Sequence, residues 1–212
     1  MPPPEQADPQ VDTETDKDLR ARILRVSVRL FADRGFGPTS MREVALAAGC
    51  TKPALYYHFG SKEALFRATV EQCLDGLLPL VAQASATKGS VRDRILALAQ
   101  GVFTATHSDP ESMRMMLVMQ TRPDKGQPDI DFARYHERNQ ALILRLFAEG
   151  IATGEVREDV NLEDAVLALL GALHSRAFLA LKGLPSSEDS PARIVDLLFR
   201  GLAPASPPRN LP

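Results

Sequence analysis

Apolar residues recur at helical spacing along most of the chain. In residues 19–31 they lie three or four positions apart, and arginines fill the other faces of the same pattern. No segment shows a convincing alternation of apolar and polar residues, which is typical of a half-buried strand. The pattern therefore predicts an all-α protein.

The periodicity predicts about nine helices in total. Gly35 and Gly37 are expected to stop the first helix after residue 31. Two short helices and a longer fourth helix follow between residues 40 and 78, and Pro79 is expected to kink or end the fourth. The remaining expected helices cover residues 91–106, 110–121, 130–153, 162–181 and 191–202.

Capping signals mark the two short helices. Ser40 is placed to cap the second helix, and Glu43, three residues later, completes a capping box. Thr51 is placed to cap the third helix, where Pro53 lies in the first turn and costs no hydrogen bond. Because Gly49 lies in the tight turn between them, the pair predicts a helix-turn-helix motif.

The third helix has the residue types that a DNA-reading helix needs. Leu55 and Phe59 lie four positions apart and are expected to face inward, while hydrogen-bond donors follow along the outer side. The charge distribution agrees with this interpretation. The net charge of the 212 residues is only −2, yet residues 17–67 contain ten Lys and Arg against four Asp and Glu. A basic module inside a nearly neutral chain is expected where one end of a protein meets a polyanion.

Residues 39–65, TSMREVALAAGCTKPALYYHFGSKEAL, closely resemble the DNA-binding signature of the tetracycline-repressor (TetR) family. The resemblance covers about residues 17–67, and its core, LYYHFGSKEAL, is highly specific. It implies a DNA-binding transcriptional regulator, not an enzyme, with an N-terminal helix-turn-helix domain and a larger C-terminal helical domain. One departure is Cys50, where the family usually has a small apolar residue. Both Cys50 and Cys73 are expected to pack as small hydrophobes, and a redox role for Cys50 is the less favoured alternative.

The resemblance also implies roles for individual residues. Arg42, Lys52 and Pro53 match base-facing positions, and Lys62 resembles a phosphate clamp at the start of the fourth helix. At least one of two adjacent tyrosines is expected to contact DNA, with the choice left open. The full predicted DNA-binding set is Ser40, Arg42, Thr51, Lys52, Pro53, Tyr56, Tyr57, His58 and Lys62.

The C-terminal half is predicted to dimerise and to bind an effector. Helices 162–181 and 191–202 are apolar on more than one side, which suits a two-fold four-helix interface. The predicted dimer contacts are Leu169, Leu173, Leu197 and Leu198. Four of the six methionines lie in residues 113–119, which favours either an adaptable apolar pocket or ordinary core packing. The candidate pocket residues are Phe103, His107, Met113, Met116, Met119, Phe132, Tyr135, His136, His174 and Phe178.

Four regions are therefore expected along the chain. Residues 1–16 are proline-rich and acidic and are expected to form a disordered tail. Residues 17–67 form the DNA-binding domain, residues 68–203 the effector-binding and dimerisation domain, and residues 204–212 a flexible tail. The longest apolar run, 165–173, is too short to span a bilayer, so we expect a cytoplasmic protein without a membrane partner.

The most favoured function is a repressor that binds a palindromic DNA operator as a homodimer and is released by a small, largely apolar effector. No cofactor and no metal site is predicted, because the histidines and cysteines lack ligand spacing. Two alternatives stay open. One is an architectural DNA-binding protein without an effector. The other, less favoured, is an all-α enzyme that uses the acidic residues Glu149, Glu155, Glu158 and Asp159, although no catalytic grouping is recognisable.

Overall fold

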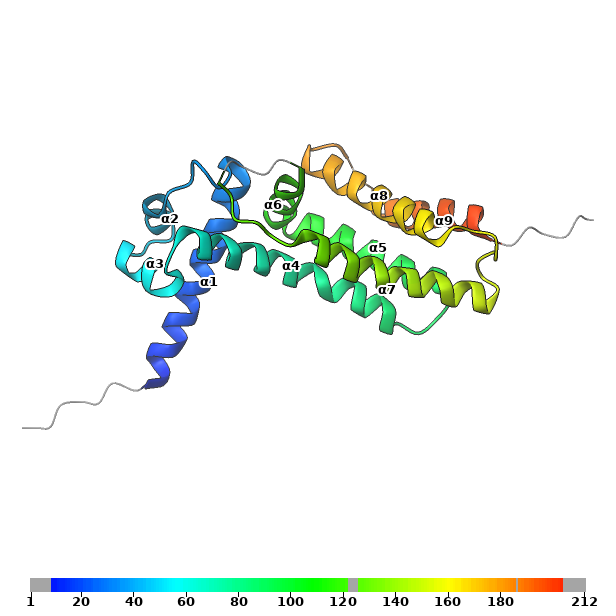
Figure 1. The fold of residues 1–212 in the computed structure, drawn as a ribbon, viewed down its shortest axis with the longest axis horizontal. Coiled ribbons are helices and arrows are strands. Elements are labelled where there is room, and N and C mark those ends of the chain that lie inside the picture. The colour runs from blue at the N-terminus through cyan, green and yellow to red at the C-terminus, as the bar shows by residue number, and fades with distance from the viewer. Residues whose placement is uncertain (1–8, 122–125, 186, 204–212) are drawn as a thin grey trace, which may run out of the picture. The chain divides into compact units, whose positions relative to one another are not determined.

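The computed structural model describes residues 9–121, 126–185 and 187–203. Over these ranges the chain is helical without strands, which confirms the all-α prediction. Figure 1 shows the helices, coloured from the N-terminus to the C-terminus. Their bounds are α1 Pro9–Arg34, α2 Met41–Ala47, α3 Lys52–Phe59, α4 Lys62–Ala86, α5 Val91–Ser108, α6 Pro110–Thr121, α7 Phe132–Thr153, α8 Leu162–Leu181 and α9 Ser190–Leu202.

Helix α1 begins much earlier than the sequence pattern indicates. Residues 9–16, which were expected to belong to a disordered tail, form its first two turns. Pro9 suits the first helical position because its missing amide hydrogen has no intrahelical partner there. The prediction of a disordered tail is therefore wrong for residues 9–16, and residues 1–8 and 204–212 lie outside the described residues.

The chain divides into two compact units. The first contains residues 1–73 and 115–130, and the second contains residues 74–114 and 131–212. In the first unit, α1 packs on α2 and α2 on α3. Its core includes three aromatic rings, in which the Phe66 ring meets the rings of Phe31 and Phe36 edge-on, with centroids 5.1 Å away in each pair.

Helix α4 contributes to both units and does not end at the proline predicted to kink or end it. The helix continues through Pro79 to Ala86. Pro79 is exposed, so water can hydrogen-bond the backbone carbonyl that the proline leaves without an amide partner.

The second unit is built around α5, α7, α8 and α9, which run side by side (Figure 1). Their buried faces share one hydrophobic core, to which Ile95, Phe147, Leu169 and Val195 contribute. By length and composition alone, α8 is apolar enough to cross a membrane. Only 28% of its most apolar stretch is buried in the chain, although α8 packs on α5, α7 and α9. Much of the apolar surface of α8 is thus left uncovered.

Candidate nucleic-acid interface

The caps predicted for the two short helices are present. At the start of α2, the Ser40 side chain accepts a hydrogen bond from the Glu43 amide at 3.2 Å. The Glu43 carboxylate accepts one from the Ser40 amide at 2.9 Å, which completes the capping box. The Thr51 hydroxyl caps α3 by accepting from the Ala54 amide at 3.2 Å. Three backbone amides that helix formation leaves without carbonyl partners are satisfied in this way.

The turn between the two helices requires a glycine. Gly49 has φ +62°, a left-handed conformation that residues with a Cβ rarely adopt. The Cys50 amide donates to the Ala45 carbonyl at 3.0 Å, which closes the turn over the end of α2. Arg22 of α1 adds a side-chain bond from Nε to the Ala48 carbonyl at 2.8 Å. Helix α1 therefore holds the turn that sets the angle between α2 and α3.

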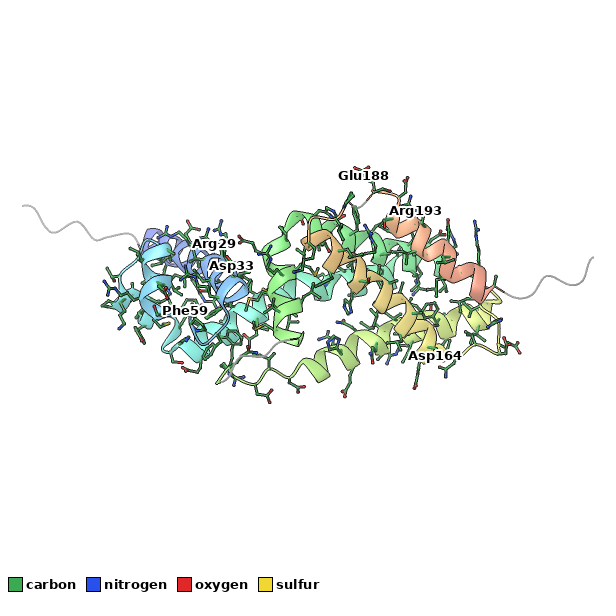
Figure 2. All side chains as sticks on the ribbon, turned by 90° about the horizontal axis from the view of Figure 1, so that it is seen from above. Arg29, Asp33, Phe59, Asp164, Glu188 and Arg193 are labelled. Atoms are coloured by element: carbon green, nitrogen blue, oxygen red, sulfur yellow. The ribbon has the colours of Figure 1, made fainter. Side chains whose placement is uncertain are left out.

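The inner face of α3 is anchored as predicted. Leu55 and Phe59 are both buried. The Arg20 guanidinium lies 5.4 Å from the centroid of the Phe59 ring, which Figure 2 labels. These contacts leave the opposite face of α3 directed toward solvent.

The structure separates the two adjacent tyrosines. Tyr57 is 82% exposed, whereas Tyr56 is 40% exposed. The Lys52 ammonium lies 5.6 Å from the centroid of the Tyr56 ring. Tyr57 is thus the tyrosine that protrudes, while Tyr56 lies partly under the lysine side chain.

The other predicted contacts of the helix-turn-helix lie on its surface. The exposed residues are Ser40, Arg42, Thr51, Lys52 and Pro53. All five come from the first turns of α2 and α3 or from their caps, and the first turns of a reading helix are the part that approaches DNA. Exposed arginines of α1, namely Arg20, Arg25 and Arg29, add positive charge to the same unit.

His58 departs from this pattern. Its side chain is only 6% exposed, and its Nε2 lies 3.4 Å from a carboxylate oxygen of Asp16. The prediction of a phosphate contact at His58 is therefore wrong for this conformation, because the ring packs toward α1 and away from the exposed face. Asp16 belongs to the part of α1 that the sequence pattern had assigned to a tail.

Lys62 is held within its own unit. Its Nζ donates to the Gly37 carbonyl at 2.9 Å and lies 4.3 Å from the centroid of the Phe36 ring. An ammonium group has three donors, so two remain for other acceptors. The side chain connects the start of α4 to the loop before α2, which gives it a structural role that the sequence prediction missed.

Leu46 is a surface residue that sequence reasoning passed over. It is as exposed as Tyr57, at 82%. It follows Arg42 by four positions on α2, so both side chains lie on one face of that helix. Helical spacing from Arg42 is the signal that would have found it.

The thiol of Cys50 lacks the environment of a reactive cysteine. Desolvation raises its pKa, and the charge of Arg22 opposes that shift only in part. The Cys73 thiol is buried, with Sγ 4.0 Å from Sδ of Met115. Both cysteines therefore fit packing roles. Among the described residues, no three His, Cys, Asp or Glu side chains gather as metal ligands would.

The ten candidate pocket residues do not converge on one described cavity. Phe103 and His107 line a cavity between α5, α8 and α9. The three methionines of the set are core residues, and Phe178 is half-exposed. His136 and His174 interact, because burial lowers the pKa of His174 and the charge of His136 lowers it further. The side chains of Phe132 and Tyr135 lie outside the described residues.

The four predicted dimer contacts fall into a buried pair and a more accessible pair. Leu169 and Leu173 are buried in the core of their own chain, although Leu169 also lines the groove that α8 and α9 form. Their contact with a partner stays a prediction. Leu197 is 76% exposed, and Leu198 is partly buried. Both residues line an open groove of about 540 Å³ along α8 and α9.

The acidic residues considered for catalysis have structural partners. A Glu155 carboxylate oxygen accepts from the Val91 amide at 2.8 Å and so caps α5. Glu149 pairs with Arg94, and Asp159 lies 3.3 Å from Nε of Arg157. These contacts account for three of the four acids without any catalytic role.

Comparison with known proteins agrees with the geometry. Residues 23–69 match the family described as bacterial regulatory proteins, tetR family. The chain is 34% identical to the HTH-type transcriptional activator FasR of Mycolicibacterium smegmatis over 99 residues, which is 47% of this chain and 45% of that protein. It is 28% identical to the HTH-type transcriptional repressor KstR2 of the same organism, over 68% of this chain and 70% of that protein.

Solved structures show the same fold over most of the chain. A TetR family transcription regulator from Marinobacter aquaeolei VT8 matches with a TM-score of 0.71 at 19% identity, over 90% of this chain and 98% of that chain. The ketosteroid transcriptional regulator KstR2 of Mycobacterium tuberculosis matches with a TM-score of 0.69 at 18% identity, over 88% and 95%. The relatives are transcription regulators and not enzymes. Residues 23–69 belong to the TetR family of bacterial regulatory proteins, and the chain has the fold of TetR family transcription regulators.

Proposed function

We propose that this protein is a cytoplasmic repressor that binds a palindromic operator as a homodimer and is released by a small, largely apolar effector. The observation that carries the DNA-binding part is the exposed face of α3, where Thr51 and Lys52 lie at the amino end of a capped helix and Tyr57 protrudes further along it. A positive helix end and an ammonium group favour phosphate, and exposed donors favour close approach to a groove. In this proposal residues 17–67 carry DNA binding and residues 68–203 carry the other functions.

The uncovered apolar surface of α8 and α9 supports the homodimer. Leu197 protrudes beside a groove whose rim carries Arg157, Asp159 and Asp164. In a two-fold interface each surface meets its own copy, so basic and acidic rim residues of two chains can pair. An exposed apolar groove with a charged rim is typical of a protein interface. Dimerisation would present two α3 helices to successive half-sites and so favour an inverted repeat.

Fewer residues support the proposed effector site in the structure than in the sequence. Of the ten candidate residues, Phe103 and His107 line a described cavity, whose wall is mostly apolar. A ligand that favours one conformation of the dimer by differential affinity would change its hold on DNA. Helix α4, which begins at Lys62 and continues through the second unit, is the covalent link for such a change.

Selection of bound sequences from random duplexes by the purified protein tests the proposal. We expect an inverted repeat and an affinity that falls steeply with salt, because lysine and arginine contacts release counterions from DNA. Arg42→Ala or Lys52→Ala should change the preferred bases. Sequence-blind binding would contradict a specific regulator and favour the architectural alternative. A screen of small molecules for release of the selected duplex tests the effector, and a reporter fused to that duplex distinguishes repression from activation.

A further inference from the structure

A small cavity in the second unit joins an apolar wall to charged and polar side chains. It lies between α5, α8 and α9. The centre of a water-sized sphere can move within about 20 Å³ of its inner part, and the whole space including the open mouth is about 300 Å³. The apolar wall is formed by Ala99, Val102, Phe103, Leu173, Ala177, Ala180, Pro191 and Ile194. The enclosed part has room for a group about the size of a water molecule or a carboxylate.

Arg176 on α8 lines this cavity and has a donor that no described residue accepts from. Its Nε is buried and has no hydrogen-bond partner among the described residues. One terminal nitrogen donates to the Pro185 carbonyl at 3.4 Å, which is a long contact. Burying a donor of a charged group without an acceptor costs folding free energy. The unpaired Nε of Arg176 therefore favours a ligand in the cavity that can accept a hydrogen bond.

The rest of the cavity wall includes the His107 ring and the start of α9. The His107 ring is oriented by a 2.8 Å contact between Nδ1 and the Phe103 carbonyl, and it lies against the Phe103 ring with centroids 4.2 Å apart. Ser190, which is buried, and Pro191 begin α9 at the cavity wall. The amino end of a helix is its positive end, which adds to the charge of Arg176.

We propose that this cavity binds a short-chain carboxylate of about two to four carbons, a size set by the small enclosed volume. The carboxylate pairs with the Nε edge of Arg176, because a guanidinium edge offers two parallel N–H donors that match two carboxylate oxygens. The alkyl chain lies along the wall near Ala180 and Ile194. An apolar wall discriminates against inorganic phosphate, which is charged on every side. The ligand's action as the effector rests on the proposed function, whereas its binding to the cavity does not.

Titration calorimetry of the full chain with sodium butyrate, in the absence of DNA, tests the site. Butyramide has the same shape without the charge, and we expect it to bind at least about tenfold more weakly, as does inorganic phosphate. Arg176→Gln should weaken butyrate binding at least about tenfold. Ala180→Met, which fills the wall and retains the guanidinium, should weaken butyrate more than acetate.

Arg193→Gln is the matched control for the arginine variant. Arg193, labelled in Figure 2, donates to the Ser187 hydroxyl at 3.2 Å and so also contacts the connection between α8 and α9. It does not line the cavity, so its loss should leave butyrate binding unchanged. Equal weakening by Arg193→Gln and Arg176→Gln would overturn the proposal, because it would mean that the connection and not the cavity matters. Equal binding of butyrate and butyramide would also overturn it.

A second measurement separates the site from the proposed function. Fluorescence anisotropy of the selected operator is followed with butyrate at constant ionic strength, with sodium chloride as the counterpart. Release by butyrate in the wild type and in Arg193→Gln, but not in Arg176→Gln, supports the carboxylate as effector. Calorimetric binding without release upholds the site and overturns the effector role. Failure of the protein to select any operator would overturn the proposed function and leave the calorimetric result on the cavity unaffected.

Discussion

Single side chains decide which face of α3 meets DNA. Tyr56 and Tyr57 are neighbours in sequence and differ twofold in exposure, and the Lys52 ammonium lies 5.6 Å from the centroid of the Tyr56 ring. His58 belongs with the packing residues, since its ring is covered and lies near Asp16. The exposed chemistry of the helix is therefore concentrated at its amino end and at one phenol.

Tyr57→Phe is expected to weaken operator binding by roughly ten- to a hundredfold, because it removes a hydroxyl placed to donate to a phosphate. The free energy of unfolding should change by no more than about 0.5 kcal/mol, because the side chain is mostly exposed. Fluorescence anisotropy and urea denaturation measure the two effects. Tyr56→Phe is the control, and its affinity for the operator should be closer to that of the wild type than the affinity of Tyr57→Phe. The reverse order of the two variants would show that Tyr56 is the DNA contact.

At the scale of elements, local signals locate most helices well. The expected ranges 110–121 and 162–181 coincide with α6 and α8, because each has a strong apolar pattern and a clear breaker at its ends. The start of α1 was not predicted, because residues 9–16 are mostly polar and carry no apolar periodicity. Pro79 gave the opposite error, because the sequence predicted a kink or an end where the helix continues. An exposed proline interrupts a single hydrogen bond and leaves the helix intact.

The capping box of α2 has a testable pH dependence. Hydrogen bonds from Ser40, assisted by the charge of Arg34, lower the pKa of Glu43 from its ordinary value of 4.5. A lowered pKa in the folded state means that ionised Glu43 adds stability above its unfolded pKa. That contribution is lost as the pH falls through the folded pKa.

Glu43→Gln should therefore be less stable than the wild type at pH 7, and the difference should shrink as the pH falls below 4.5. Urea denaturation between pH 3 and pH 7 measures the difference. Glu188→Gln is the control, because Glu188 is an exposed glutamate in the connection between α8 and α9 (Figure 2). A stability difference for Glu43→Gln that is constant across this range would exclude a role for the ionised carboxylate.

Two helical glycines should respond oppositely to alanine. A Cβ at Gly150 in α7 would lie 2.7 Å from Cγ2 of Val156, a buried side chain. A Cβ at Gly76 in α4 meets no atom within 4 Å. Gly76→Ala should raise the free energy of unfolding by about 0.5–1 kcal/mol through helix propensity. Gly150→Ala should lower it by about 1–2 kcal/mol, because overpacking exceeds the same gain. Thermal and urea denaturation of both variants measure these changes, and stabilisation of Gly150→Ala would mean that the Val156 side chain moves freely.

At the scale of the whole molecule, sequence identifies apolar surface better than it identifies what covers that surface. Helices α8 and α9 are apolar on several sides, and the pattern alone cannot separate core contacts from partner contacts. Leu169 and Leu173 therefore entered the predicted interface although they pack inside their own chain. The candidate effector pocket meets the same difficulty, because methionines that fill a core and methionines that line a cavity have the same spacing, and Met113, Met116 and Met119 are buried. The caps and the turn of the helix-turn-helix were predicted correctly, because they depend on residues that are neighbours in the sequence.

Leu197→Glu tests whether the α8 and α9 groove forms the proposed homodimer. The side chain is 76% exposed in the single chain, so the variant should fold with nearly unchanged helical circular dichroism. In a two-fold interface the change would place two carboxylates in an apolar contact, so we expect the protein to sediment as a monomer. Operator binding should weaken at least about a hundredfold, because a monomer contacts a single half-site. Leu184→Glu is the matched control, since Leu184 is also an exposed leucine but does not line the groove. If Leu197→Glu sediments as the wild-type dimer, the interface lies elsewhere and the uncovered apolar face of α8 and α9 needs another partner.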